Sequence, residues 1–90
     1  MFVPRPETEV LVTVGSTGAF VVAALSLIDP GDEVILFAPF YGYHRNILNL
    51  CGARLRIVET RAPDWRLDPA EVRAAFSSRT RAVVINTPSN

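Results

Sequence analysis

The chain has 90 residues, 49% of them hydrophobic, and its nine basic side chains balance nine acidic ones to leave no formal net charge. This length fits one domain or part of one, and the apolar content is far above that of a disordered chain. A neutral chain lacks the basic surface that attracts nucleic acid or an anionic membrane, so we expect neither as a partner. A single cysteine cannot form an internal disulfide, and we therefore expect a soluble protein in the reducing cytoplasm.

All nine basic residues are arginines, and the sequence contains no lysine. A genome with arginine-favouring codon usage is the simplest explanation. The absence also excludes any mechanism that needs a lysine amine from this chain. The longest apolar stretch, Ala19 to Ile28, is too short to cross a bilayer, and residues 1–8 lack the apolar run of a signal peptide.

The first part of the chain predicts a strand followed by a helix. Residues 1–6 form a lead-in loop. Val10 to Val14 is a β-branched run closed by Gly15, which predicts a buried strand because apolar residues occupy both of its faces. Ser16 and Thr17 suit the N-cap of a helix over residues 18–28. A turn containing Pro30 and Gly31 then ends that helix.

The middle of the chain repeats this order. Glu33 to Ala38 predicts a second buried strand, and Tyr43 to Cys51 predicts an amphipathic helix. Gly52 stands where a glycine commonly ends a helix. Polar and apolar side chains alternate over Ala53 to Glu59, which predicts a strand with one polar face near a sheet edge.

The last part adds one more helix and strand. Asp68 and Pro69 predict the start of a short helix through Phe76, with proline at its first position. Arg81 to Ile85 predicts a fourth strand. Strands that alternate with helices across short connections indicate an α/β fold, a three-layer and mostly parallel sheet with right-handed crossover helices.

In such a sheet, ligands bind at the carboxyl ends of the strands, where three segments of this chain are expected to meet. They are residues 15–18, 39–42 and 86–90. The first is a glycine-bracketed turn at a helix N-terminus, where backbone N–H groups and the helix dipole stabilise a phosphate. Capping by Ser16 or Thr17 explains the same residues without any ligand. The turn matches neither a Walker loop nor a complete dinucleotide fingerprint.

Other polar and aromatic residues leave similar alternatives open. The Phe40-Tyr41 pair offers a flat face for a ring ligand, or it covers the edge of the core. Asn90 can hydrogen-bond a polar substituent on such a ring, although asparagine is common in turns. His44 lies on the polar face of its helix and is expected to be an ordinary exposed histidine. The acidic residues near Asp32 fit a solvated turn, so no metal site is predicted.

Taken together, these segments resemble class I/II aminotransferases, which are pyridoxal-phosphate enzymes of fold type I. The resemblance rests on Thr13-Val-Gly-Ser-Thr-Gly-Ala19, Asp29-Pro-Gly-Asp-Glu-Val34, Pro39-Phe-Tyr41, Arg79-Thr-Arg81 and Asn86-Thr-Pro-Ser-Asn90. It runs from about Pro6 to Asn90 in the family's order and approximate spacing. Residues 1–90 are therefore similar to a fragment of the family's large, cofactor-binding domain.

The resemblance implies a role for several residues. Gly15, Ser16 and Thr17 match the segment that holds the cofactor phosphate, Tyr41 matches the aromatic that stacks on the pyridine ring, and Asn90 matches the asparagine that hydrogen-bonds its phenolic oxygen. The parent enzyme would move an amino group between an amino acid and a 2-oxo acid, as a homodimer. In the family, the Schiff-base lysine and the residues that grip the pyridine nitrogen and the substrate carboxylate lie beyond Asn90. We therefore expect no catalytic residue in this chain, which would be inactive alone.

The sequence departs from the family pattern at two places. Gly18 stands where many relatives carry Glu or Gln, and Tyr41-Gly42-Tyr43-His44 differs from the commoner aromatic-Asp-x-Tyr form. Three alternatives stay open: a pyridoxal-phosphate-dependent lyase or decarboxylase of the same fold, a non-catalytic α/β interaction module, and an unrelated nucleotide-binding domain.

Overall fold

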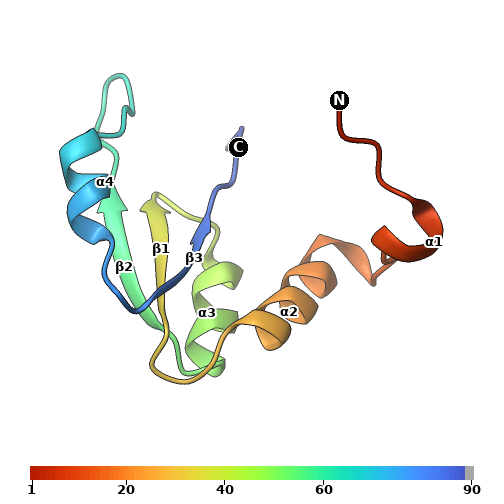
Figure 1. The fold of residues 1–90 in the computed structure, drawn as a ribbon. Helices are drawn as coiled ribbons and strands as arrows, with labels where there is room; N and C mark the ends of the chain where they lie inside the picture. Colours follow the sequence, from red (N-terminus) through yellow and green to blue (C-terminus); the bar gives the residue numbers. More distant parts are fainter. Residues whose placement is uncertain (89–90) are drawn as a thin grey trace.

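A computed structural model describes residues 1–88 of the chain. Its centre is a three-stranded sheet made of β1 (Glu33–Ala38), β2 (Arg54–Glu59) and β3 (Thr80–Val84) (Figure 1). The strands lie in the order β2-β1-β3, and both pairings are parallel. The predicted parallel α/β fold is confirmed, and the alternating strand β2 lies at an edge as its pattern predicted.

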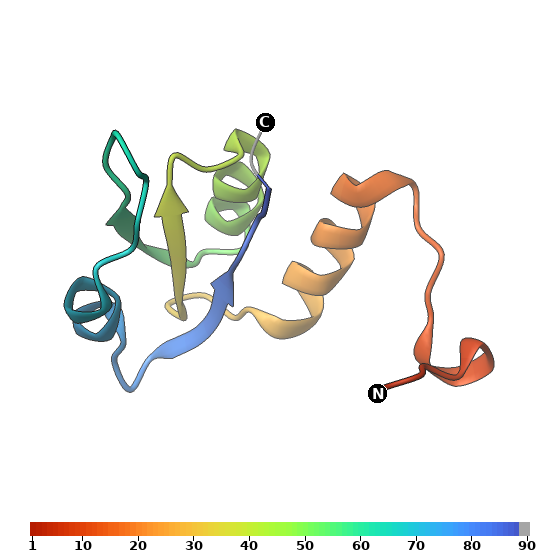
Figure 2. The same cartoon turned by 90° about the horizontal axis from the view of Figure 1, so that it is seen from above.

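Two helices connect the strands. Helix α3 (Gly42–Leu50) joins β1 to β2, and α4 (Pro69–Ala75) joins β2 back across the sheet to β3. Because these crossovers run in opposite directions, connections of the same hand must place their helices on opposite faces of the sheet. Figure 2 shows α3 and α4 on opposite sides, which is the predicted three-layer arrangement. No helix within residues 1–88 is long and apolar enough to span a membrane.

The hydrophobic core lies between the sheet and the pair formed by α2 (Gly15–Leu27) and α3. Val34 and Leu36 of β1 point into it and are almost completely buried. Because β1 is the central strand, it is buried on both faces and carries a continuous apolar run. The edge strand β2 instead alternates polar and apolar side chains. The core cluster consists of Ala24, Ile28, Val34, Leu36, Ile47 and Leu48.

Local sequence signals set the ends of α3 and α4. Asp68 caps α4, because its carboxylate accepts a hydrogen bond of 2.9 Å from the backbone N–H of Ala70, and Pro69 opens the helix as predicted. Gly52 follows α3 with a φ of +78°, a left-handed conformation that favours glycine. These signals fix where the chain enters β2 and where it leaves the β2–α4 loop.

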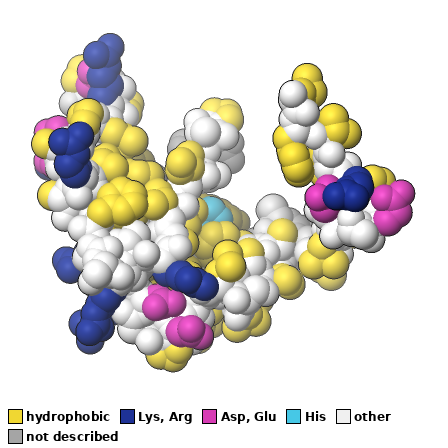
Figure 3. Space-filling view, in the orientation of Figure 1, with side chains coloured by type: hydrophobic (Ala, Val, Ile, Leu, Met, Phe, Trp, Pro, Cys, Tyr) yellow, Lys and Arg dark blue, Asp and Glu magenta, His cyan; other side chains and the backbone are white. Residues whose placement is uncertain are grey.

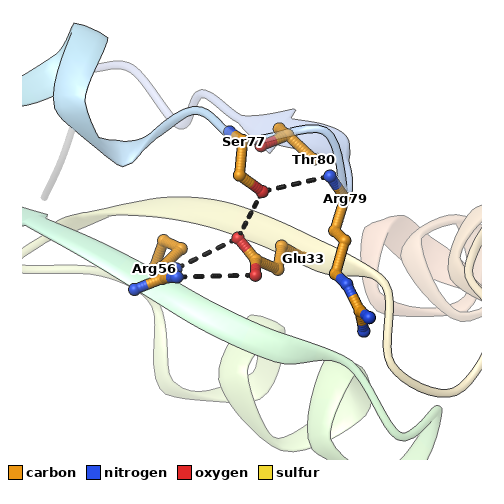
Figure 4. A network of polar contacts seen from close by, with 5 residues as sticks. All are labelled: Glu33, Arg56, Ser77, Arg79 and Thr80. Atoms are coloured by element: carbon orange, nitrogen blue, oxygen red, sulfur yellow. Dashed lines mark hydrogen bonds and ion pairs between the residues drawn. The ribbon is translucent and has the colours of Figure 1, made fainter.

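Glu33 is the buried charged residue of the described chain, and it lies at the amino end of β1 (Figure 4). Arg56 of β2 donates from Nε to Glu33 Oε1 at 3.1 Å, and the Ser77 hydroxyl donates to the same oxygen at 2.9 Å. The backbone N–H of Arg79 donates to Ser77 Oγ at 3.0 Å. This network connects β1, β2 and the turn before β3 at the end of the sheet opposite to the predicted ligand site.

The strand predicted over Val10–Val14 is wrong. The structure contains a short helix, α1 (Pro6–Glu9), and then an extended segment outside the sheet. Val12 and Val14 are 91% and 94% exposed, and the segment extends away from the sheet (Figures 1 and 3). A strand needs a neighbouring strand to satisfy its backbone, and none lies beside this segment within residues 1–88. Residues 10–14, with their apolar side chains, are called the N-terminal arm below.

Candidate functional site

Three predicted segments meet in a cleft at the carboxyl end of the sheet. They are the first turn of α2, the first turn of α3 with the residue before it, and the segment that follows β3. The cleft has a volume of about 320 Å³. Its lining residues are Ser16, Thr17, Tyr41, His44, Asn86 and Pro88.

The first turn of α2 forms one wall of the cleft. The helix begins at Gly15, three residues before the predicted start, so that Ser16 and Thr17 lie inside its first turn and are not its caps. Gly15 has a φ of +69°, and its Cβ position faces open space. Among the described residues no side chain caps this end. The Gly15 N–H donates to the carbonyl of Thr13 at 3.0 Å. The next N–H groups, those of Ser16 and Thr17, lack helical partners and are available to a ligand, beside their own exposed hydroxyls.

The two aromatic residues after β1 have different environments. Phe40 packs against the core cluster, whereas Tyr41 lines the cleft and is 47% exposed. The Tyr41 ring lies 5.2 Å from that of Tyr43, measured between centroids. Phe40 therefore covers the core edge, whereas Tyr41 presents its ring to the cleft, and its contact with a ring ligand stays a prediction.

His44 is not the ordinary exposed histidine that we predicted. It is half-buried, and its ring stacks on Phe20 of α2 with centroids 4.2 Å apart and an interplanar angle of 26°. Its other contact is with Tyr41, in an edge-on arrangement at 5.4 Å. Burial lowers the pKa of His44, because the charged imidazolium loses solvation there. The spacing of three residues between Tyr41 and His44 is a sequence signal for the contact between these two, whereas nothing in the local sequence indicates the stacking on Phe20.

A larger, mainly apolar groove of about 670 Å³ adjoins the cleft, and His44 and Asn86 line both. Trp65 and Leu67 from the β2–α4 loop form part of its lining, together with Ile85 after β3. Asn86 is a site residue that the sequence analysis did not single out, although it belongs to the predicted 86–90 segment. Asn90, which was singled out, lies outside the described residues. Residues 1–88 contain no group of three or more potential metal ligands.

The sequence profile described as aminotransferase class I and II matches residues 3–90. The chain belongs to this aminotransferase family. Among curated aminotransferases, a probable N-succinyldiaminopimelate aminotransferase of Mycobacterium tuberculosis is 47% identical over 88 residues, which cover 94% of this chain. Kynurenine–oxoglutarate transaminase 3 of Bos taurus is 39% identical and covers 96% of the chain. These matches span only 22% and 21% of the two relatives, so the chain corresponds to about a fifth of their length.

Solved aminotransferases share the fold. The YbdL protein of Escherichia coli, described as having a methionine aminotransferase function, superposes on 99% of this chain with a TM-score of 0.95 and 36% identity. The N-succinyldiaminopimelate aminotransferase of Mycobacterium tuberculosis superposes on 96% of it with a TM-score of 0.89 and 45% identity. In both cases the chain covers 23% of the solved protein. The partial α/β architecture of this chain is therefore that of fold type I.

Proposed function

We propose that this chain forms the phosphate and ring cradle of a pyridoxal-phosphate-dependent aminotransferase. The observation that carries the proposal is the cleft in which the uncapped N-terminus of α2 meets the ring of Tyr41. The parent protein would be a cytoplasmic homodimer that moves an amino group between an amino acid and a 2-oxo acid. The names of the relatives, all aminotransferases, favour this reaction over the lyase or decarboxylase alternative.

The phosphate would bind at the first turn of α2. The N–H groups of Ser16 and Thr17, which have no partner within the helix, would donate to it, and the hydroxyls of the same two residues add two more donors in the cleft. The helix dipole contributes roughly half a positive charge at this end. No charged residue occurs anywhere in α2, and so no carboxylate on this helix repels an anion. The left-handed φ of Gly15 turns the chain into the helix and leaves its Cβ position open.

The pyridine ring would lie against Tyr41, whose exposed ring offers an apolar face at the mouth of the cleft. Asn86 supplies a polar amide in the same cleft. The role of Asn90 as partner of the phenolic oxygen stays a prediction from the family resemblance. These donor and ring groups fit a phosphorylated aromatic ligand.

When bound, pyridoxal phosphate acts as an electron sink for the amino-acid substrate. The residues of this chain would bind its phosphate and orient its ring, and the absence of lysine leaves no side-chain amine for covalent attachment. We therefore expect cofactor binding without transamination when the chain is tested alone.

Binding of pyridoxine 5′-phosphate, measured by titration calorimetry, tests the proposal. This analogue has no aldehyde and cannot react with the α-amino group of Met1, the one primary amine of a lysine-free chain. Removing the hydroxyls in Ser16→Ala/Thr17→Ala should weaken binding about tenfold or more, because a hydrogen bond to a charged group contributes roughly 1.5–3 kcal/mol.

Ser26→Ala is the matched control, because Ser26 also lies on α2 but donates to Val22 O at 2.7 Å, outside the cleft. It should bind the analogue like the wild type. Absence of binding, or equal binding by Ser16→Ala/Thr17→Ala, would contradict the proposal. Tighter binding of adenosine monophosphate would favour the nucleotide-binding alternative.

A further inference from the structure

Three aromatic side chains form a continuous row that runs from the core to the cleft, and two of them, His44 and Tyr41, line the cleft. Phe20 comes from α2, His44 from the first turn of α3, and Tyr41 from the residue before α3. His44 is the middle member, stacked face to face on Phe20 and edge-on to Tyr41. The row connects the helix that carries Ser16 and Thr17 to the residue that presents its ring to the cleft.

Within residues 1–88, the imidazole of His44 has no ionic partner. Helix α2 contains no charged residue, and Arg45 is the charged residue of α3. The other titratable groups nearby are the phenols of Tyr41 and Tyr43, and neither is a carboxylate. Asn86, which lines the same cleft from beyond β3, is uncharged. The neutral form of His44 therefore has a packed aromatic site, whereas its cation would be partly buried without a counter-charge.

Building on the proposed function, we propose that His44 is a positioning residue: its neutral imidazole, held by Phe20, fixes the Tyr41 ring at the mouth of the cofactor cleft. Protonation gives the imidazole a positive charge, and the cation is more stable when water solvates it. The imidazole therefore moves away from Phe20, and Tyr41 loses its contact with it. Tyr41 is about half exposed, and its ring has one further aromatic neighbour among the described residues, Tyr43, at 5.2 Å between centroids. The orientation of Tyr41 should therefore follow the charge of His44.

A proton NMR titration of the unliganded chain between pH 8 and pH 5 tests this directly. The chain has one histidine and two tyrosines, so the Tyr43→Phe variant assigns the ring signals of Tyr41. We expect the Tyr41 ring signals to shift with the same midpoint as the His44 imidazole, and below the ordinary histidine value. Tyr41 signals that do not change with pH, or that change with another midpoint, would overturn the proposal.

Two substitutions separate positioning from simple packing. His44→Phe keeps an aromatic ring against Phe20 but cannot titrate, so the Tyr41 shift between pH 8 and pH 5 should disappear. His44→Ala removes the ring, and the Tyr41 signals should resemble those of the low-pH wild type at every pH. A Tyr41 shift that persists unchanged in His44→Phe would overturn the proposal. If a variant does not fold, the titration of the wild type still shows whether the Tyr41 ring signals follow the charge of His44.

Binding of pyridoxine 5′-phosphate links the row to the cofactor site. Below the pH midpoint of His44 titration, the affinity of the wild type for the analogue should fall severalfold further than the affinity of His44→Phe. The ionisations of the ligand itself affect both proteins equally, so this comparison removes their contribution. At pH 8 the two proteins should bind alike, and His44→Ala more weakly. Equal pH profiles for wild type and His44→Phe would count against the proposal. A wild-type chain that binds no analogue contradicts the proposed function, while the unliganded titration still decides the role of His44.

Discussion

At the scale of single residues, Glu33 shows how this small sheet tolerates a buried charge. Glu33 is 5% exposed, and its carboxylate is held by Arg56 and Ser77, whose hydrogen bonds together outweigh the desolvation that burial imposes. The hydrogen bonds from Arg56 and then Ser77 therefore lower the pKa of Glu33 below its ordinary value. Arg56 itself stays more than half exposed, so the guanidinium keeps most of its hydration.

This lowered pKa makes folding stability depend on pH. The ionised carboxylate stabilises the fold fully above the pKa of the unfolded state, and the contribution is lost as pH falls through the lower folded pKa. Urea unfolding of Glu33→Gln should show lower stability than the wild type at pH 7. The difference should shrink below about pH 5, where the unfolded carboxyl begins to protonate. A stability difference between wild type and Glu33→Gln that stays constant down to pH 3 would contradict this role of the ionised Glu33 carboxylate.

Two turn glycines with similar backbone angles allow a matched comparison. Gly31 and Gly52 have φ values of +89° and +78°, but a Cβ on Gly31 would meet nothing within 4 Å, whereas one on Gly52 would lie 3.1 Å from Pro30 Cα. Gly31→Ala should cost roughly 1–2 kcal/mol from the left-handed conformation alone. Gly52→Ala should cost more, because backbone atoms of Pro30 must also move. Thermal or urea unfolding measures both, and equal losses would contradict the predicted clash.

At the scale of elements, the sequence predicts well those segments whose partners lie within the chain. The strands β1, β2 and β3 and the helices α3 and α4 were all predicted within a few residues, because each has its hydrophobic face and its end signals in its own sequence. The apolar run of Val10–Val14 has the same composition as a buried strand but no adjacent strand among the described residues. A sequence pattern shows that a segment can be buried, and only the tertiary contacts show what buries it.

The candidate site, like the helices and strands, could be predicted only as far as local sequence signals extend. The rule that ligands bind at strand carboxyl ends placed Tyr41 correctly. Ser16 and Thr17 also line the cleft, although the strand predicted before them is absent from the described residues. His44 was misjudged because a helix pattern separates polar from apolar faces but does not show that Phe20 of another helix covers the imidazole. Asn86 was passed over because asparagine is common in turns, and nothing in its local sequence indicates that it lines a cleft.

The N-terminal arm should make the isolated chain associate with itself. Its valines and Leu11 are 53–94% exposed, and an extended apolar segment outside the sheet favours contact between molecules. Sedimentation velocity should show larger species as the concentration rises. Val12→Asp should reduce this association while the circular dichroism spectrum stays the same. Thr8→Asp adds the same charge beside the arm without removing an apolar side chain, and an equal effect of the two substitutions would contradict this role of the arm.

At the scale of the whole molecule, the two ends of the sheet have separate tasks. The amino end holds the Glu33 network, which fastens the strands together, and the carboxyl end holds the cleft with its uncapped helix and aromatic row. The superposition on solved aminotransferases extends over nearly all of the chain, although the chain covers about a fifth of their length. Folding and the proposed cofactor binding thus depend on different residues, and substitutions at one end should leave the other largely unchanged.

The most direct measurement is an amide chemical-shift map of the chain during titration with pyridoxine 5′-phosphate at neutral pH. If the cleft is the cofactor cradle, the largest shifts will occur at the amides of Ser16, Thr17 and Gly18 in the first turn of α2 and at Tyr41. Amides around Glu33 and Arg56, at the opposite end of the sheet, should change little. Shifts centred on that opposite end, or no saturable shifts at all, would contradict the central claim.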